Sequence, residues 1–153
     1  CHSRPNISLC RRRKKGKLKF KTLSGSEKRV PLSHKYLIDW DSASKSKFQR
    51  NVKIFLKDYW LNHVVFEEFP VVGTRLSLDF FNANKYIAIE VQGDQHTKYV
   101  PFFHGKYKNN YLQQLKRDHQ KQEFCELNNI KLVEIYSSDI IGADLFKSYN
   151  IKL

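Results

Sequence analysis

Residues 76–96 read LSLDFFNANKYIAIEVQGDQH, and this stretch decides the fold expected for the chain. Apolar and polar residues alternate over 75–82 and again over 86–92, which predicts two β-strands. A short turn, Ala83 to Lys85, separates them, so the strands are expected to form a hairpin. Leu76, Leu78 and Phe80 are predicted to share one face of the first strand. Asp79 is predicted on the other face, which in the second strand carries Ala88, Glu90 and Gln92.

Asp79 and Glu90 stand at positions where a tight hairpin brings two carboxylates together. With the backbone carbonyl of Val91 they supply hard oxygen ligands suited to Mg²⁺ or Mn²⁺. Such an ion polarises a phosphodiester and lowers the pKa of a bound water. His96, just after the second strand, can exchange a proton near neutral pH. The alternative is an ordinary pair of strand carboxylates neutralised by neighbouring lysines.

The charge of the chain indicates its partner. The 153 residues carry a formal net charge of +13, and the pI is near 9.7. This excess favours a polyanion. No apolar run approaches the roughly 18–20 residues that span a bilayer, so nucleic acid is a better partner than a membrane. Three cysteines without a secretory signal predict a reducing, intracellular compartment.

Residues 1–29 concentrate the positive charge. We interpret residues 1–40 as a basic DNA-binding arm or extension, and residues 41–153 as one further domain. An arm of this kind follows phosphates and releases counterions; the alternative is a solvated tail. The cations predicted to bind DNA here are Arg11, Arg12, Arg13, Lys14, Lys15, Lys17 and Lys19. Cys1, His2 and Cys10 could form part of a zinc site, although their spacing matches no usual ligand set.

The remaining elements follow from hydrophobic periodicity. Helical spacing predicts a helix over 43–62 with Asp41 or Ser42 as its N-cap, and a strand over 63–72 comes next. After the hairpin, 97–108 reads as a loop with interleaved aromatic and basic residues. A second helix over 109–128 should carry Tyr111, Leu112, Leu115 and Cys125 on one face, and a last strand covers 131–136. The fold class is therefore α/β (α+β), with a mixed sheet flanked by helices.

This order and the motifs LDFF, IAIEVQGDQH and QLKRDHQKQEFCELNNIKLVEI resemble the PD-(D/E)XK nuclease superfamily. The branch with very-short-patch repair endonucleases and phage EDxHD homing endonucleases is the most similar. The resemblance covers about residues 45–136, and it implies a restriction-endonuclease-like core in the order α-β-β-β-α-β.

The resemblance also implies roles for individual residues. Asp79 and Glu90 would hold the metal, and Gln92 would stand where the family often has Lys. His96 would assist proton transfer, and Asp118 would match an acidic residue of the following helix. Gln49 occupies the position of a Glu on the first helix, with Glu67 and Glu68 as candidate substitutes. Further DNA contacts are expected from Lys98, Lys106, Lys116 and Arg117.

The expected function is a Mg²⁺-dependent double-stranded DNA endonuclease of the homing type, from a phage or bacterium, acting in the cytoplasm of the bacterial host. A single site cuts one strand, so a double-strand break requires a homodimer, a tetramer or two successive nicks. Three alternatives remain. They are a mismatch-repair nicking enzyme, a non-catalytic DNA-binding or junction-binding module on the same fold, and a structural component of a nucleoprotein assembly.

Overall fold

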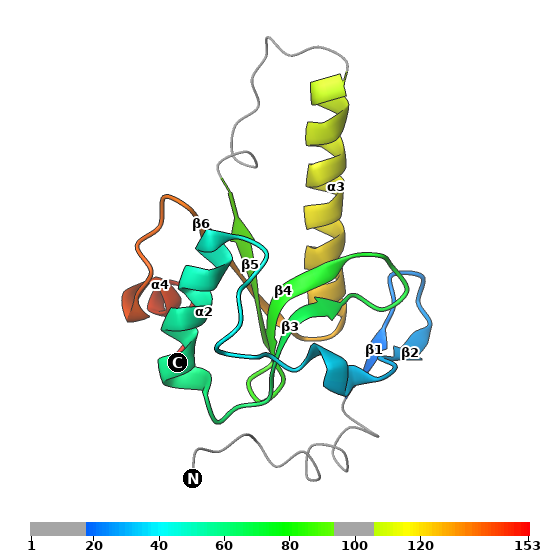
Figure 1. Ribbon diagram of the computed structural model, residues 1–153. Helices are drawn as coiled ribbons and strands as arrows, with labels where there is room; N and C mark the ends of the chain where they lie inside the picture. The colour runs from blue at the N-terminus through cyan, green and yellow to red at the C-terminus, as the bar shows by residue number, and fades with distance from the viewer. Residues whose placement is uncertain (1–17, 94–105) are drawn as a thin grey trace.

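A computed structural model describes residues 18–93 and, as backbone from residue 106 and with side chains from residue 109, the chain up to residue 153. Its elements, coloured along the chain in Figure 1, are β1 (Lys19–Lys21), β2 (Glu27–Arg29), the 3₁₀-helix η1 (Ser33–Tyr36), α2 (Lys47–Trp60), β3 (Val65–Pro70), β4 (Ser77–Asn82), β5 (Ile87–Gln92), α3 (Lys106–Leu127), β6 (Lys131–Tyr136) and α4 (Ala143–Ser148). In the described part of the chain, no helix is long and apolar enough to cross a membrane.

The four longer strands form one mixed sheet in the order β3-β4-β5-β6. β4 runs antiparallel to both β3 and β5, whereas β6 runs parallel to β5, with Ile87 opposite Lys131 and Gln92 opposite Tyr136. The long α3 helix provides the crossover that a parallel pair requires. The structure therefore confirms an α+β protein with a mixed sheet, and β6 has the bounds predicted from the sequence.

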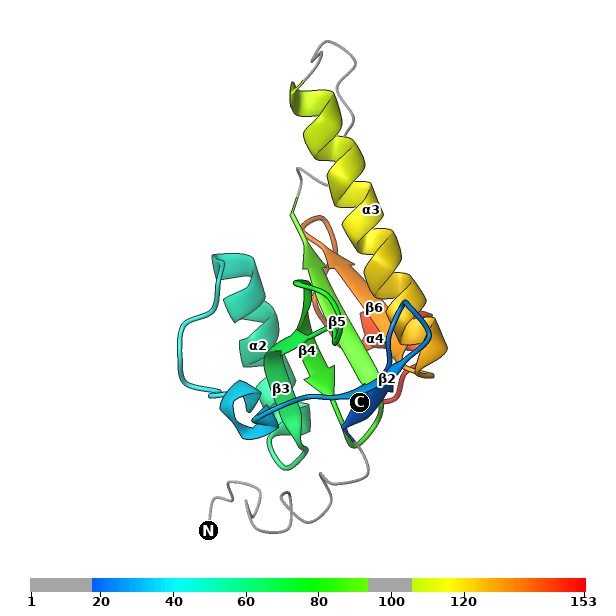
Figure 2. The same ribbon diagram turned by 90° about the vertical axis from the view of Figure 1, so that its right-hand side faces the viewer.

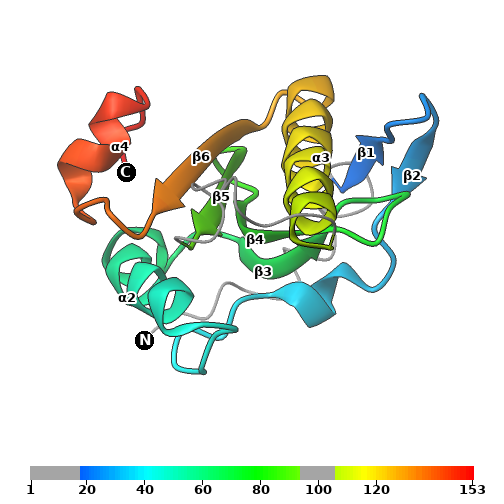
Figure 3. The same ribbon diagram turned by 90° about the horizontal axis from the view of Figure 1, so that it is seen from above.

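Helices cover both faces of the sheet, as the view from above shows (Figure 3). On one face α3 contributes Phe124 and Cys125, and the β1–β2 hairpin contributes Phe20, to a core that includes Phe81 and Ala88. On the other face α2 and α4 pack against strand residues; this core includes Leu56, Trp60, Phe80, Ile89, Val133 and Phe146. β5 alternates between the two cores as predicted.

The predicted alternation in β4 is wrong over its first half. Leu78 packs in the α3-side core with Phe81, whereas Phe80 packs against α2. The interruption lies where β3 meets β4. Glu68 has a left-handed backbone with φ 52°, and the strand register passes from Glu67↔Phe80 to Phe69↔Leu78 without a pair between them. The left-handed residue turns β3, so that Phe66 and Phe69, three residues apart, both pack in the α3-side core. The change of face in β4 occurs opposite this residue in the ladder.

The first long helix is shorter than predicted. α2 begins at Lys47, because the Oγ of Ser46, and not Asp41 or Ser42, caps it by accepting a hydrogen bond from the Gln49 amide at 3.1 Å. Lys53 lies on a helix that carries several other basic residues, yet it is fully buried. Its ammonium contacts Glu67 at 2.8 Å, which satisfies a charge that would otherwise be costly to bury.

The α3 helix packs along only part of its length. Leu112 and Leu115 are 50% and 44% exposed, and the helix buries Phe124 and Cys125 near its C-terminal end. Figures 1 and 2 show why: the N-terminal half of α3 extends past the ends of the strands. Only the C-terminal half of α3 therefore has a sheet to pack against.

The described part of the N-terminal extension folds onto the same core. β1 and β2 form an antiparallel hairpin, and Leu18, Phe20 and Val30 are buried with residues of the main sheet. Lys19 pairs with Glu27 at 3.3 Å on the surface of this hairpin. The extension from residue 18 onward and the main sheet thus share one hydrophobic core.

Candidate functional site

Asp79 and Glu90 meet where β4 and β5 stop pairing. The ladder runs from Asn82↔Ile87 to Phe80↔Ile89 and goes no further, so the next opposed pair is Asp79 and Glu90. Their contacts replace the backbone ladder. The amide of Asp79 donates to Oε1 of Glu90 at 3.0 Å, and the amide of Val91 donates to Oδ2 of Asp79 at 2.8 Å. The predicted proximity of the two carboxyl groups is confirmed.

The pair is buried and electrostatically unfavourable when both groups are charged. Asp79 is 9% exposed and Glu90 is 4% exposed. Burial, with a smaller contribution from Glu68, raises the pKa of Asp79 to about 6. Burial and then the Asp79 charge raise the pKa of Glu90 to about 8, against the opposing effect of Lys121. Two buried carboxylates with raised pKa values are typical of a site that binds a cation or exchanges protons.

Lys121 is the functional candidate that the sequence analysis missed. Its ammonium lies 2.9 Å from Oε2 of Glu90, and its side chain is 16% exposed. Burial alone would lower the pKa of Lys121, but the charges of Glu90, Asp79 and Asp118 outweigh burial and raise it. Lys121 is therefore the cation that lies against the carboxylate pair. The sequence signal for Lys121 was its position three residues after Asp118, which places both side chains on one face of the helix.

Gln92 and Asp118 both border the pair without hydrogen-bonding to it. Gln92 is 5% exposed and lies at the end of β5, on the face that carries Glu90. Asp118 is half-buried and accepts a hydrogen bond from Nε2 of Gln114 at 3.0 Å. Its effect on the site reaches Lys121 through charge, since it helps to raise the pKa of that lysine.

Gln49 connects α2 to the acidic residues of β3. Its Nε2 donates to Oε2 of Glu67 at 3.0 Å and to Oε1 of Glu68 at 3.1 Å. Glu67 is also held by Lys53 and by the Ser44 hydroxyl, at 2.8 and 2.7 Å. Glu68 additionally accepts from the Ser77 hydroxyl at 3.0 Å, and it acts on Asp79 by charge. Of the two candidate substitutes for a helix Glu, Glu68 is thus the one that influences the pair.

The donor set fits a hard divalent cation with a largely open coordination sphere. In an extended strand the N–H and C=O of one residue leave from the same edge, so the Val91 carbonyl lies on the side where its amide meets Asp79. Two carboxylates and this carbonyl match the way Mg²⁺ is usually held, with water and substrate phosphate completing the shell. Across residues 18–93 and 106–153, no group of three or more His, Cys, Asp or Glu side chains is arranged to hold a metal.

Several predicted residues lie outside the described residues, so their roles stay predictions. These are Cys1, His2, Cys10, the cations from Arg11 to Lys17, His96, Lys98 and the side chain of Lys106. Lys116 and Arg117 are described and are exposed on α3.

Comparison with known proteins finds relatives in viruses. No family model and no solved structure matches the chain. Over 66 residues it is 38% identical to the uncharacterized protein 094L of Frog virus 3 (isolate Goorha), a match covering 43% of each chain. It is also 33% identical to the uncharacterized protein 033L of Invertebrate iridescent virus 3, over 43% of this chain and 34% of that protein. The matches thus span less than half of each relative, and they lend no support to a phage or bacterial origin.

Proposed function

We propose that this protein is a divalent-metal-dependent endonuclease that hydrolyses phosphodiester bonds of double-stranded DNA. The observation that carries the proposal is the buried Asp79–Glu90 pair at the point where two strands separate, with Lys121 against one carboxylate. The order α2-β3-β4-β5-α3-β6 around a mixed sheet supports a restriction-endonuclease-like core. The net charge of +13 supports a polyanionic substrate.

In this proposal each residue has a distinct task. Asp79, Glu90 and the Val91 carbonyl hold Mg²⁺ or Mn²⁺, which when bound supplies Lewis-acid stabilisation of charge on the phosphate. Lys121 places a second positive charge beside the scissile phosphate, and Gln92 orients the phosphate or the attacking water. His96 accepts the proton of that water as the new P–O bond forms and the old one breaks. Cleavage of both strands requires a dimer, a tetramer or two successive nicks.

A homing-type, site-specific enzyme and a mismatch-repair nicking enzyme would use the same chemistry. Sequencing the ends of DNA cut from a random library separates them, because a homing enzyme leaves breaks at one long site and a nicking enzyme leaves single-strand breaks at mispairs.

A non-catalytic DNA-binding or junction-binding module is the second candidate. The observation that favours it is Gln49, whose amide is tied to Glu67 and Glu68 where the resemblance predicts a charged Glu. In this reading the carboxylates and Lys121 serve only to keep the end of the sheet together.

Plasmid cleavage distinguishes the two candidates. In Mg²⁺ or Mn²⁺ the wild type should convert supercoiled DNA to nicked or linear form, and Asp79→Asn should bind DNA without cutting it. Asp58→Asn, which removes an exposed carboxylate from α2, is the matched control and should cut normally. If the wild type binds DNA but leaves it intact with both metals and on a library of sequences, the binding-module reading is correct.

A further inference from the structure

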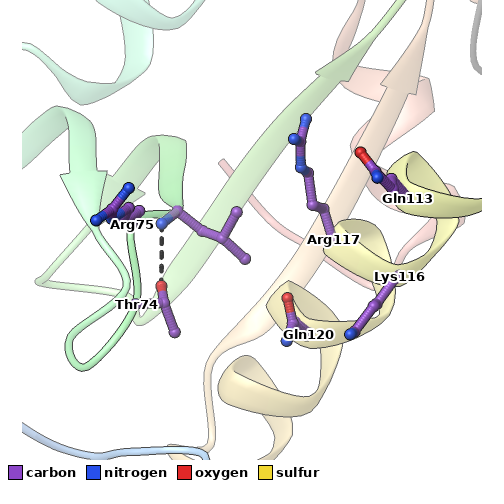
Figure 4. Close-up of a pocket in the computed structure, with 7 residues that line it drawn as sticks. Thr74, Arg75, Gln113, Lys116, Arg117 and Gln120 are labelled. Atoms are coloured by element: carbon purple, nitrogen blue, oxygen red, sulfur yellow. Dashed lines mark hydrogen bonds between the residues drawn. The ribbon is translucent and has the colours of Figure 1, made fainter. Parts of the chain in front are cut away.

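A second functional feature lies beside the carboxylate pair, between α3 and the loop that joins β3 to β4. Here a groove of about 380 Å³ is lined by Arg75, Lys116 and Arg117, with the neutral side chains of Thr74, Gln113 and Gln120. Figure 4 shows Arg75 on the loop side and the other cations on the helix side of this space. None of the described residues that line the groove is acidic.

The side chains of the three cations of the groove form no ion pair with any residue that the structure describes. No side-chain hydrogen bond between described residues involves Arg75, Lys116 or Arg117 either. All three are exposed. Uncompensated guanidinium and ammonium groups converging on one cavity favour an anionic ligand, and Arg suits phosphate oxygens because it offers a planar fork of donors.

The loop wall of the groove is held in place before any ligand binds. The Thr74 hydroxyl donates to the Val71 carbonyl at 2.8 Å and accepts from the Leu76 amide at 3.0 Å, the bond drawn in Figure 4. Gly73 adopts φ +83° and packs so closely on Thr22 that an added Cβ would lie 3.2 Å from its methyl group. The loop is therefore fixed against the β1–β2 hairpin, so the backbone that carries Arg75 needs little ordering on binding.

The groove leads to the candidate cleavage site. Arg117 and Lys121 are four residues apart on one face of α3, about 6 Å along the helix axis. Lys121 contacts Glu90, and Arg75 lies on the segment that enters β4, four residues before Asp79. Cations follow one another from the groove to the carboxylates, which is the pattern expected for a track along a phosphodiester backbone.

We propose that this groove binds backbone phosphates of the nucleic acid next to the phosphate that is cut, with Arg75 and Arg117 gripping them from opposite walls. Gln113 and Gln120 donate further hydrogen bonds to phosphate or sugar oxygens. The contacts are to the backbone, so they position the substrate and carry no base specificity. This inference rests on the proposed nuclease function for its substrate, although binding can be measured without cleavage.

The test uses the full chain with Asp79→Asn in a chelator, so that binding is measured apart from cutting. The variant carries in addition either Arg75→Gln, Lys116→Gln and Arg117→Gln, or a control triple of exposed lysines elsewhere, Lys131→Gln, Lys147→Gln and Lys152→Gln. Each triple removes three charges. Affinity for a fluorescent DNA duplex is followed from low to high salt.

We expect the groove triple to bind at least tenfold more weakly, and to reduce the slope of log K against log salt by about 2–3, since each lost phosphate contact removes about 0.9. The control triple should change the slope by less than one. Equal slopes for the two triples would overturn the proposal. Binding to anionic vesicles, without binding to DNA, would also overturn it in favour of a membrane surface.

Cleavage assays on the wild type, and on the groove triple with Asp79 left intact, separate this inference from the proposed function. If the wild type does not cut DNA but the groove triple loses binding, the groove is a nucleic-acid site on a non-catalytic protein. If the wild type cuts and the groove triple cuts and binds like the control, the nuclease proposal stands and the groove proposal fails.

Discussion

The backbone amide of Asp79 donates a hydrogen bond to the carboxylate of Glu90 at 3.0 Å, immediately beyond the last paired residues of β4 and β5. A side chain thus takes the place of a ladder partner. This relationship keeps two carboxyl groups together in a buried position, where each raises the cost of ionising the other. It also makes the stability of the protein depend on pH and on cations in ways that can be measured.

The metal-free protein should lose stability as the pH rises. The folded-state pKa values, about 6 for Asp79 and about 8 for Glu90, lie above the ordinary values of 3.8 and 4.5 for these side chains. The folded state therefore binds more protons than the unfolded state, and the stabilisation present below about pH 4 is lost between pH 4 and 8. Denaturant unfolding in a chelator should show a loss of several kcal/mol in the free energy of unfolding over this pH range. Glu90→Gln should flatten the curve, and an unchanged slope would contradict the assignment.

Mg²⁺ or Mn²⁺ should stabilise the protein more at pH 8 than at pH 5. At low pH the ion must displace protons from Asp79 and Glu90, and that competition weakens binding. Thermal melts with and without each metal measure the effect directly. Asp79→Asn should abolish the metal-dependent shift, whereas Asp58→Asn should keep it. A shift that survives in Asp79→Asn would place the metal elsewhere.

Lys121→Gln should destabilise the protein increasingly above pH 8, because it removes the cation that keeps the pKa of the buried Glu90 down to about 8. At pH 8 Glu90 can take up a proton instead, so the loss there should be about 1 kcal/mol or less. Near pH 5, where Glu90 is protonated, the cost should nearly vanish. Adding Glu90→Gln should restore stability above pH 8, which denaturant unfolding would show.

A catalytic role for Lys121 makes a further prediction. Lys121→Gln should fail to cut plasmid even at a pH where it is folded, and Lys121→Arg should recover part of the activity. Full activity in folded Lys121→Gln would leave Lys121 a purely structural ion pair.

The buried ion pair between α2 and β3 should respond asymmetrically to substitution. The Lys53 side chain is 0% exposed and that of Glu67 is 15% exposed. Glu67→Gln strands a fully buried ammonium and should cost about 3–5 kcal/mol. Lys53→Met leaves a carboxylate that still accepts from Ser44 and Gln49, and should cost only about 1–2 kcal/mol. Denaturant unfolding measures both variants. Equal losses of unfolding free energy in Glu67→Gln and Lys53→Met would contradict the expected difference between the two partners.

Gln49→Glu tests whether residue 49 of α2 only links the helix to β3 by hydrogen bonds or stands at a position that can also bind the metal. Gln49 donates to two carboxylates, and a Glu there can only repel them. In a chelator the substitution should cost about 2 kcal/mol or more, and Gln49→Ala should cost less. If the proposed metal site extends to α2, Mg²⁺ should restore stability to Gln49→Glu but not to Gln49→Ala. Equal responses of the two variants to Mg²⁺ would restrict the site to Asp79, Glu90 and Val91.

The sequence by itself determined the order of the main elements, the hairpin and the meeting of Asp79 with Glu90. Strand alternation and turn residues are local signals, and two carboxylates on facing strands are placed by register alone. It did not reveal the change of face between Leu78 and Phe80 in β4, nor the left-handed backbone of Glu68 in the neighbouring β3, because no residue pattern signals either. Ser46 was not singled out as the cap of α2 because several nearby polar residues were equivalent candidates.

Tertiary structure alone decided which charges meet. Lys121 and Glu90 are 31 residues apart, and Arg75 faces Lys116 and Arg117 only because α3 crosses beside the β3–β4 loop. Lys53 is charged in a stripe of lysines, yet it is buried because Glu67 and Ser42 lie opposite it. The periodicity of a helix predicts which residues share a face. It does not predict which partner that face will meet, and the energy of a buried charge depends on that partner.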